Sequence, residues 1–393
     1  MRACFDFFYN ECSLSENGYG LIRDRWPGHP DMASIAGVGF GLAAYCIGAE
    51  YGYVSFSAAE ERVRRTFETL EKLDRFKGFY RHFYNMNTGE PFRCEVSTID
   101  TAILLLGVHT AGNYFGGEIR KSADKLEQSV EWSEFLRPDN IFHMAYDEKR
   151  GFFAKWDEYA EQLMMYVLAA ASQSYHVGKE AYYAFTRTYG KYKDIEYIYT
   201  YNGSLFTHQY SQAFIDFKGR RDKNGTDWFI NAVNATRAAK AFCIDDAVNH
   251  PTYNENCWGL TACDTPRGYV GNQGNPPCGG DGKAALSLGV VAPAGALGSL
   301  PFCPDDALKA LDYYCSLQKA TGKYGLCDAF STEIDWYAEN VICIDKGITL
   351  VQAANLKDGF VWKVFNDERI ARALDELEIK RYNDYRSVFI KKK

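Results

Sequence analysis

The 393-residue sequence predicts an all-α fold, an (α/α)6 barrel, or toroid, built from six helical hairpins. Three observations lead to this prediction. Apolar residues recur at helical spacing along the whole chain and mark about twelve segments. The connections between these segments alternate between short and long, and no Pro-, Ser- or Gly-rich linker interrupts them. We therefore expect a single domain over residues 1–393.

The predicted helices form six consecutive pairs. They lie near residues 32–50 and 57–75, 97–113 and 117–136, 157–174 and 179–190, 206–213 and 225–243, 283–294 and 304–320, and 345–356 and 366–376. The connection within each of the first three pairs is brief, as at residues 51–56. Helices joined by a short loop pack as antiparallel neighbours. We expect the first helix of each pair in an inner ring and the second in an outer ring.

Long connections precede the inner helices. They cover roughly residues 76–96, 137–156, 191–205, 244–282 and 321–344. Because the inner helices all run in the same direction, every long connection enters an N-terminal end on one rim. Functional residues are commonly held on loops by a rigid scaffold. The functional site is therefore expected on this rim.

Aromatic side chains are abundant, with 28 Tyr, 26 Phe and 7 Trp. Many fall in the long connections: Phe79, Tyr80, Phe83, Tyr84, Phe152, Phe153, Trp156, Tyr197, Tyr199, Tyr201, Trp258, Tyr269, Tyr324 and Trp336. Sugars present apolar C–H faces and polar edges, which amphipathic rings match. An aromatic-rich helical core explains the same composition equally well. The clustering in the rim loops favours a sugar-binding cleft.

Three carboxylates stand at the starts of predicted inner helices: Asp100, Glu161 and Asp345. Glu161 is followed at i+3 and i+4 by Met164 and Met165, so it continues the apolar stripe that faces the interior. A partly desolvated carboxyl keeps its proton, as a general acid requires. Asp345 is expected to stay ionised and to activate water as the general base.

Helix capping is the alternative explanation for these acids. Ser97 and Asp100 have the spacing of a capping box, and Asp345 could be the N-cap of its helix. The helix dipole favours an acid such as Glu161 in a first turn. Each acid alone fits capping better, whereas three on one rim leave both explanations open.

Further candidates for sugar binding lie on the same rim. His208, Gln209 and Tyr210 begin an inner helix, although a lone His is more often structural. Arg25, next to Asp24, would close the rim or form a surface ion pair.

Composition excludes other classes of function. The net charge is −7, and Lys391–Lys393 form the one short basic run, so we expect no nucleic-acid partner. The apolar stretches are too short to cross a bilayer, so no membrane association is expected. Asp6 lies where a signal peptide needs its apolar run, which predicts a cytoplasmic location. The twelve cysteines include no C-x-x-C pair and His is scarce, so we expect no metal and no cofactor.

Eight segments resemble a known family. They are DRWP at 24–27, SIAGVGFGLAAY at 34–45, STIDTA at 97–102, LFTHQYS at 205–211, IDF at 215–217, WGLTA at 258–262, YGLCDAF at 324–330 and IDKG at 344–347. The chain resembles the glycoamylase-like domain family, which includes the family 144 β-1,2-glucanases. It is more distantly similar to the cyclisation domain of cyclic β-1,2-glucan synthases.

This resemblance implies an (α/α)6 barrel that hydrolyses β-1,2-linked glucans by inversion and without a metal. It implies Glu161 as the acid, with Asp345 and Asp100 as further essential carboxylates. The glucanases carry additional acids just before Asp100, where this chain has Arg93, Glu95 and Ser97. Glu95 is the candidate to replace them.

The sequence thus predicts a glycoside hydrolase acting on β-linked gluco-oligosaccharides, by endo or exo action. Glu161, Asp345 and Asp100 are the predicted catalytic residues. The predicted substrate-binding residues are Arg25, Glu95, Trp156, His208, Gln209, Tyr210, Trp258, Asp328 and Trp336. Two alternatives remain open: a retaining transglycosylase on β-glucan, as in the synthase-type relatives, and a non-catalytic oligosaccharide-binding protein.

Overall fold

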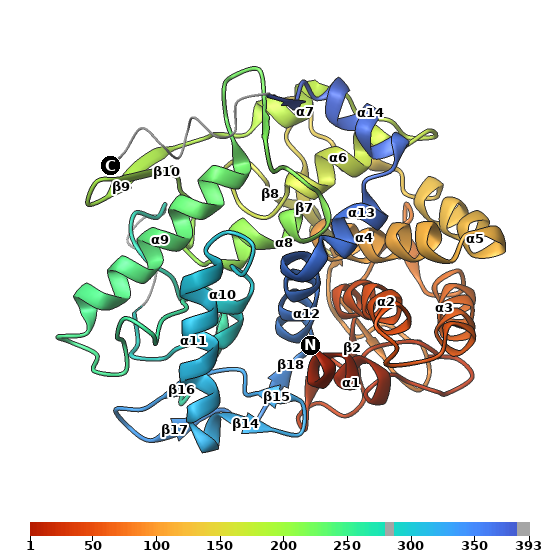
Figure 1. Ribbon diagram of the computed structural model, residues 1–393. Helices are drawn as coiled ribbons and strands as arrows, with labels where there is room; N and C mark the ends of the chain where they lie inside the picture. Colours follow the sequence, from red (N-terminus) through yellow and green to blue (C-terminus); the bar gives the residue numbers. More distant parts are fainter. Residues whose placement is uncertain (280–286, 383–393) are drawn as a thin grey trace.

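The structure is a computed structural model, and it describes residues 1–279 and 287–382. Helices form its scaffold (Figure 1). They are α1 (Arg2–Asn10), α2 (Ile35–Glu50), α3 (Phe56–Leu70), α4 (Thr98–Phe115), α5 (Gly117–Gln128), α6 (Leu163–Ala171), α7 (Lys179–Ala184), α8 (Phe206–Phe214), α9 (Trp228–Asp246), α10 (Pro293–Leu297), α11 (Pro304–Ser316), α12 (Cys343–Asp358), α13 (Phe360–Phe365) and α14 (Glu368–Glu376). Two short 3-10 turns lie at Trp132–Phe135 and Gln318–Ala320. The basic run at residues 391–393 lies outside the described residues.

Six helices follow one another around the interior. α2 packs between α4 and α12, α4 also contacts α6, and α12 also contacts α8 and α10. Hydrogen bonds join the remaining neighbours: the Ser211 hydroxyl of α8 accepts from Met164 N of α6 at 3.0 Å, and Gln209 Nε2 of α8 donates to Gly295 O of α10 at 2.8 Å. Figure 1 shows α12 between α2 and α10.

The other helices cover this circuit from outside. α3 packs on α2, α5 on α4, α7 on α6, α9 on α8 and α11 on α10. Every residue of α2 from Ile35 to Gly48 is buried, and a helix that is apolar on all sides belongs in a core. The packing therefore matches the predicted inner and outer helices for the first five pairs. The sixth pair differs, because α14 packs on α6 and α1 covers α12.

Glycine lets α2 and α4 approach closely. A Cβ built on Gly39 would lie 2.3 Å from Ile103 O, and one built on Gly107 would lie 2.0 Å from Gly39 O. Since neither space accepts a methyl group, the glycines fix the distance between the two helices.

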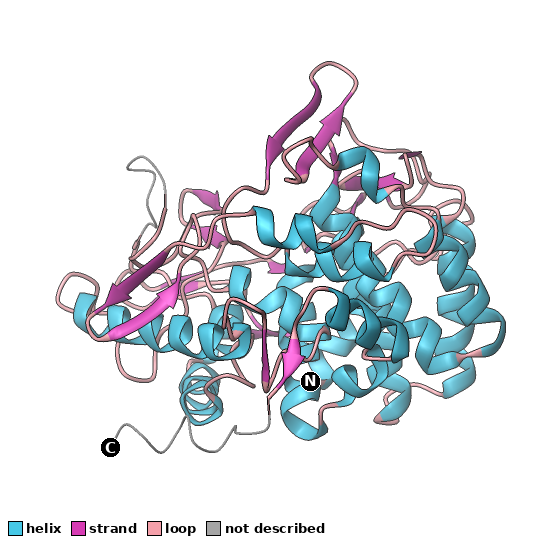
Figure 2. Cartoon of the chain, turned by 90° about the horizontal axis from the view of Figure 1, so that it is seen from above, coloured by secondary structure: helices cyan, strands magenta, loops and turns pink. Residues whose placement is uncertain are grey.

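Short antiparallel strands, most of them in the long connections, accompany the helices, so the fold is not purely α. Their bounds are β1 (Arg25–Trp26), β2 (Met32–Ser34), β3 (Arg75–Phe76), β4 (Phe79–Tyr80), β5 (Phe83–Asn85), β6 (Val96–Ser97), β7 (His143–Asp147), β8 (Gly151–Lys155), β9 (Tyr189–Tyr192), β10 (Ile195–Ile198), β11 (Arg220–Arg221), β12 (Cys263–Thr265), β13 (Gly268–Val270), β14 (Thr321–Gly322), β15 (Gly325–Leu326), β16 (Phe330–Ser331), β17 (Trp336–Tyr337), β18 (Val341–Ile342) and β19 (Lys380–Arg381). Figure 2 shows a pair of strands projecting beyond the helices. Strands of two to five residues are too short for alternation to reveal them.

Two predicted helix starts were wrong. The segment predicted as 283–294 is not helical over residues 287–292, and α10 begins at Pro293, which fits a first helical turn. Its residues 283–286 lie outside the described part. The helix predicted from 157 begins at Leu163, because Thr186 pairs with the backbone of the preceding loop and Gln162 Nε2 donates to Glu158 O at 2.7 Å.

In the part of the chain that the structure describes, no helix has the length and apolarity to cross a membrane.

Candidate active site

The three predicted catalytic acids lie at N-terminal ends of interior helices. Asp100 is in the first turn of α4, Asp345 is in the first turn of α12, and Glu161 lies two residues before α6. The charges of Asp345 and Glu161 both act on Tyr210 of α8, which is 5% exposed. Burial raises the pKa of the Tyr210 hydroxyl, and the charges of Asp345 and Glu161 raise it further. The Tyr210 hydroxyl therefore lies within range of the charges of both carboxyls.

Glu161 is set up to hold a proton near neutral pH. Burial raises the pKa of its carboxyl to about 7, and the charge of Asp100 acts in the same direction. The apolar surroundings disfavour the ionised form, and the nearby negative charge disfavours it further. A carboxyl that titrates near neutrality can donate a proton to a leaving oxygen.

Asp345 is paired with Asp328, a residue in the preceding loop. Burial and the neighbouring Asp328 carboxylate raise the pKa of Asp345 well above its usual range. Asp328 is 3% exposed, and its Oδ2 accepts a 2.6 Å hydrogen bond from Asp264 N, whereas its Oδ1 has no hydrogen-bond partner among the residues that the structure describes. Two adjacent buried carboxyls do not both ionise readily. The raised pKa contradicts the expectation of a freely ionised Asp345, because each carboxyl disfavours ionisation of the other.

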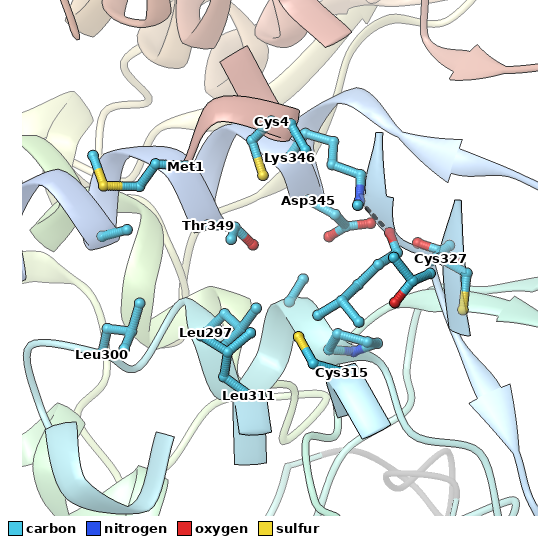
Figure 3. Close-up of a pocket in the computed structure, with 18 of the residues that line it drawn as sticks. Met1, Cys4, Leu297, Leu300, Leu311, Cys315, Cys327, Asp345, Lys346 and Thr349 are labelled. Carbon is cyan, nitrogen blue, oxygen red and sulfur yellow. Dashed lines mark hydrogen bonds between the residues drawn. The ribbon is translucent and has the colours of Figure 1, made fainter. Parts of the chain in front are cut away.

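Asp345 also faces an apolar cavity of about 270 Å³. Figure 3 shows Asp345 and Thr349 projecting from α12 toward Leu297 and Leu311. The Lys346 ammonium, on the next residue of α12, donates a hydrogen bond to the carbonyl of Leu326. The apolar walls explain why burial is the largest cause of the raised pKa of Asp345.

Arg25 is held close to the start of α12. Strand β1 pairs with β18, with Arg25 opposite Ile342. The Arg25 guanidinium donates to Asp24 at 3.2 Å and to Asp264 at 3.0 Å, and its central carbon lies 5.6 Å from the Tyr269 ring centroid. Its side chain is only 16% exposed, so the alternative of a solvated surface ion pair does not hold.

His82 is a site residue that the sequence did not single out. Its Nδ1 lies 2.9 Å from Glu95 Oε1, and its Nε2 lies 3.7 Å from Asp100 Oδ1. Burial alone lowers the pKa of His82, but Asp100 and Glu95 outweigh it and raise the pKa to about 9. Its position among rim aromatics was the available signal, since Phe83 stacks on the imidazole at 3.8 Å.

The capping explanation holds for one acid only in part. Ser97 is the N-cap of α4: its hydroxyl accepts from Asp100 N at 3.2 Å and donates to Asp100 Oδ2 at 2.5 Å. The N-cap of α12 is Ile342, so Asp345 caps no helix. Glu161 precedes its helix, whose N-cap is Gln162.

A family model described as "Putative glucoamylase" matches residues 154–369, more than half of the chain. The chain belongs to this glycoamylase-like family. Among residues 1–279 and 287–382, the family member has no group of three or more His, Cys, Asp or Glu side chains arranged to hold a metal ion.

Similar proteins and structures extend along most of the chain. A "putative glucoamylase" from Bacteroides fragilis NCTC 9343 is 30% identical, with a TM-score of 0.86 over 97% of this chain and 96% of that one. The endo-β-1,2-glucanase from Chitinophaga pinensis, solved with sophorotriose and glucose, is 26% identical, with a TM-score of 0.85 over 96% of each chain.

A curated relative is the exo-β-1,2-glucooligosaccharide sophorohydrolase (non-reducing end) of Parabacteroides distasonis. It is 28% identical over 394 residues, which cover 89% of this chain and 53% of that protein. This family member therefore spans about half the length of the curated relative.

Four predicted sugar contacts of this glycoamylase-family chain are buried beneath the rim. Trp258 is 0% exposed, so no face of its ring is open to a sugar. Gln209 Nε2 is taken by Gly295 O and Ser299 Oγ, both at 2.8 Å. These two side chains belong to the scaffold, and the prediction that they bind substrate was wrong.

His208 and Trp156 are also structural. His208 is 2% exposed, and burial lowers the pKa of its imidazole to about 3, so it stays neutral. Trp156 is 5% exposed and donates its indole N–H to Thr98 Oγ1 at 3.0 Å. Trp336 differs, since it is half-buried on strand β17 opposite Ser331 and keeps part of its ring open.

Proposed function

We propose that this chain is a glycoside hydrolase that cleaves β-1,2-linked gluco-oligosaccharides with inversion. The observation that carries the proposal is the presence of two titratable centres at the starts of interior helices, whose charges both act on the Tyr210 hydroxyl: Glu161, whose pKa is raised to about 7, and Asp345 with its neighbour Asp328. Two carboxyl centres with different proton affinities are the equipment that glycoside hydrolysis needs.

We propose that the circuit of interior helices is the inner ring of an (α/α)6 barrel and that the chain is one catalytic domain. The helix contacts support this, since each interior helix carries an outer partner or the N-terminal α1. A cytoplasmic location stays a prediction.

In the proposed reaction, Glu161 gives its proton to the glycosidic oxygen as the bond to the anomeric carbon breaks. A water molecule on the opposite face attacks that carbon and releases its proton to Asp345. The proton already on Asp345 then passes to Asp328, so the pair ends with two protons and Glu161 ends ionised. Exchange with solvent restores both centres.

The substrate class rests on the relatives. One acts on β-1,2-gluco-oligosaccharides, and another is an endo-β-1,2-glucanase bound to sophorotriose. We propose Arg25, Glu95, Tyr210 and Asp328 as residues that hold or shape the sugar site, with Trp336 as an aromatic contact at the rim. Asp100 would position the sugar beside Glu161.

A panel of linkage-defined glucotrioses tests this proposal. The chain should cleave the β-1,2-linked trisaccharide in preference to the β-1,3, β-1,4 and β-1,6 isomers. Proton NMR of the first product should show the α-anomer, as inversion requires. A β-anomer would indicate retention and a transglycosylase-type reaction, and no cleavage of any isomer by the folded protein would overturn the proposal.

A further inference from the structure

The side chains of Glu95, His82 and Asp100 lie in a row that ends near the candidate acid, Glu161. The imidazole of His82 lies between the two carboxylates, with Nδ1 at 2.9 Å from Glu95 Oε1 and Nε2 at 3.7 Å from Asp100 Oδ1. Asp100 in turn acts on Glu161, because its charge raises the pKa of that carboxyl. This row of side chains therefore connects Glu95 at the rim with the proposed proton donor.

Backbone pairing holds this arrangement in place. His82 N donates to Glu95 O at 3.0 Å, and the His82 carbonyl accepts from Ile35 N, the first residue of α2, at 3.1 Å. The Phe83 ring stacks on the imidazole with an interplanar angle of 13°, which fixes the plane of the ring. Both ring nitrogens are then directed along the line between the carboxylates.

The Asp100 carboxylate is held from two sides. Ser97 Oγ donates to Oδ2 at 2.5 Å, whereas Oδ1 faces His82. The hydrogen bond from Ser97 and the charge of His82 at 3.7 Å together favour one orientation of this carboxylate.

The charges around His82 favour the imidazolium. Asp100, Glu95 and Asp24 all raise its pKa, which reaches about 9. The neighbouring cation Arg81 turns away and pairs with Asp74 at 3.0 Å and with Glu148. At neutral pH, both ring N–H groups are therefore available as donors.

We propose that His82 is a positioning residue that acts through Asp100: held by Glu95, it fixes the Asp100 carboxylate for the reaction. This inference rests on the proposed hydrolysis. It assigns roles to two side chains, His82 and Glu95, that need not touch the reacting atoms.

A double-mutant cycle tests the coupling, with kcat and KM measured on sophorotriose. His82→Gln should lower kcat by about 10²-fold with little change in KM, since a displaced catalytic group costs about that much. In an Asp100→Asn background, His82→Gln should cause no further loss. Glu95→Gln should reduce kcat in the wild-type background but not in the His82→Gln background. Equal losses in both backgrounds would overturn the inference.

The control is His176→Gln, which removes a surface His paired with Glu376 at 2.8 Å and should leave kcat unchanged. Thermal melting of each variant identifies losses that come from unfolding.

NMR titration of the imidazoles gives a readout that does not need activity. The resonance missing in His82→Gln should titrate near pH 9 in the wild type, and Glu95→Gln and Asp100→Asn should each lower that midpoint. If the wild type hydrolyses no β-1,2-glucan but this pattern holds, only the proposed function fails. A midpoint below 7 that neither variant moves would overturn the role of His82.

Discussion

Glu161 is half-buried within range of the charge on Asp100, and both desolvation and that charge raise the pKa of its carboxyl to about 7. The two residues come from different helix starts, α6 and α4. Burial is the larger cause of the raised pKa, and the charge of Asp100 adds to it and links the titration of Glu161 to a second residue.

The first prediction concerns the basic limb of the pH profile. Glu161 can donate a proton only while protonated, so kcat should fall as pH rises through about 7. Asp100→Asn removes a negative charge that raises this pKa, so the limb should move to lower pH, in addition to any loss in rate. Rates on sophorotriose between pH 5 and pH 9 (roughly the range over which the acid titrates) measure both effects. An unmoved limb would show that Asp100 does not act on Glu161.

Glu161→Gln should separate activity from stability. Loss of the proton donor should reduce kcat by about 10²- to 10⁴-fold. The folded-state pKa of Glu161 is raised, so the native protein loses stability as pH rises above the unfolded pKa toward about 7 and beyond. A neutral Gln avoids this loss and should stabilise the fold at pH 8 by up to about 3 kcal/mol.

Urea unfolding at two pH values provides the measurement. Near pH 4 the stabilities of the wild type and Glu161→Gln should converge, because the native Glu161 carboxyl is then neutral, as the Gln side chain is. In the unfolded chain, about one half of the Glu161 carboxyls are also protonated at this pH. Equal stability at pH 8 would contradict a desolvated Glu161.

Asp328→Asn should change the acidic limb. Burial is the largest cause of the raised pKa of Asp345, and the Asp328 carboxylate adds to it. Removing that carboxylate should lower the pKa of Asp345 and move the acidic limb of kcat/KM to lower pH. Asp358→Asn, at the far end of α12 where Asp358 accepts from the Tyr51 hydroxyl at 3.0 Å, is the matched control and should leave the profile unchanged.

The position of the site was predictable because it depends on helix order. Short and long connections alternate along the sequence, and this places the starts of α4, α6 and α12 on one rim together with Asp100, Glu161 and Asp345. Periodicity and loop length are local properties, so they can be recognised in a single sequence. The same reasoning also indicated that Glu161 points inward.

The contacts between loops were not predictable in this way. His82 lies near Asp100 because the backbones of Arg81 and Val96 form an antiparallel β-bridge. This pairing joins residues 15 positions apart, and no periodicity of the sequence predicts it. The Asp328–Asp345 pair likewise depends on how the loop before α12 folds back. A carboxyl's protonation state depends on such neighbours, so the expectation for Asp345 failed while its location was right.

Trp258 and Trp336 illustrate the same limit, and substitution should distinguish them. Both lie in long connections, but Trp258 is fully buried with Leu205, Val291 and Phe330, whereas Trp336 is half-buried at the rim. Trp258→Ala should destabilise the fold by about 3–5 kcal/mol, because it leaves a large cavity in a packed cluster. Trp336→Ala should cost little stability and should raise KM for sophorotriose, since an aromatic sugar contact is lost.

Chemical denaturation and initial rates on the same two variants decide between these roles. Trp258→Phe is the control for the core site: it preserves an apolar ring, so it should recover part of the stability that Trp258→Ala loses and should leave KM at the wild-type value. A raised KM in Trp258→Phe with unchanged stability would mean that this ring reaches the sugar after all. An unchanged KM in Trp336→Ala would remove Trp336 from the proposed cleft and leave Arg25 as a candidate for substrate contact.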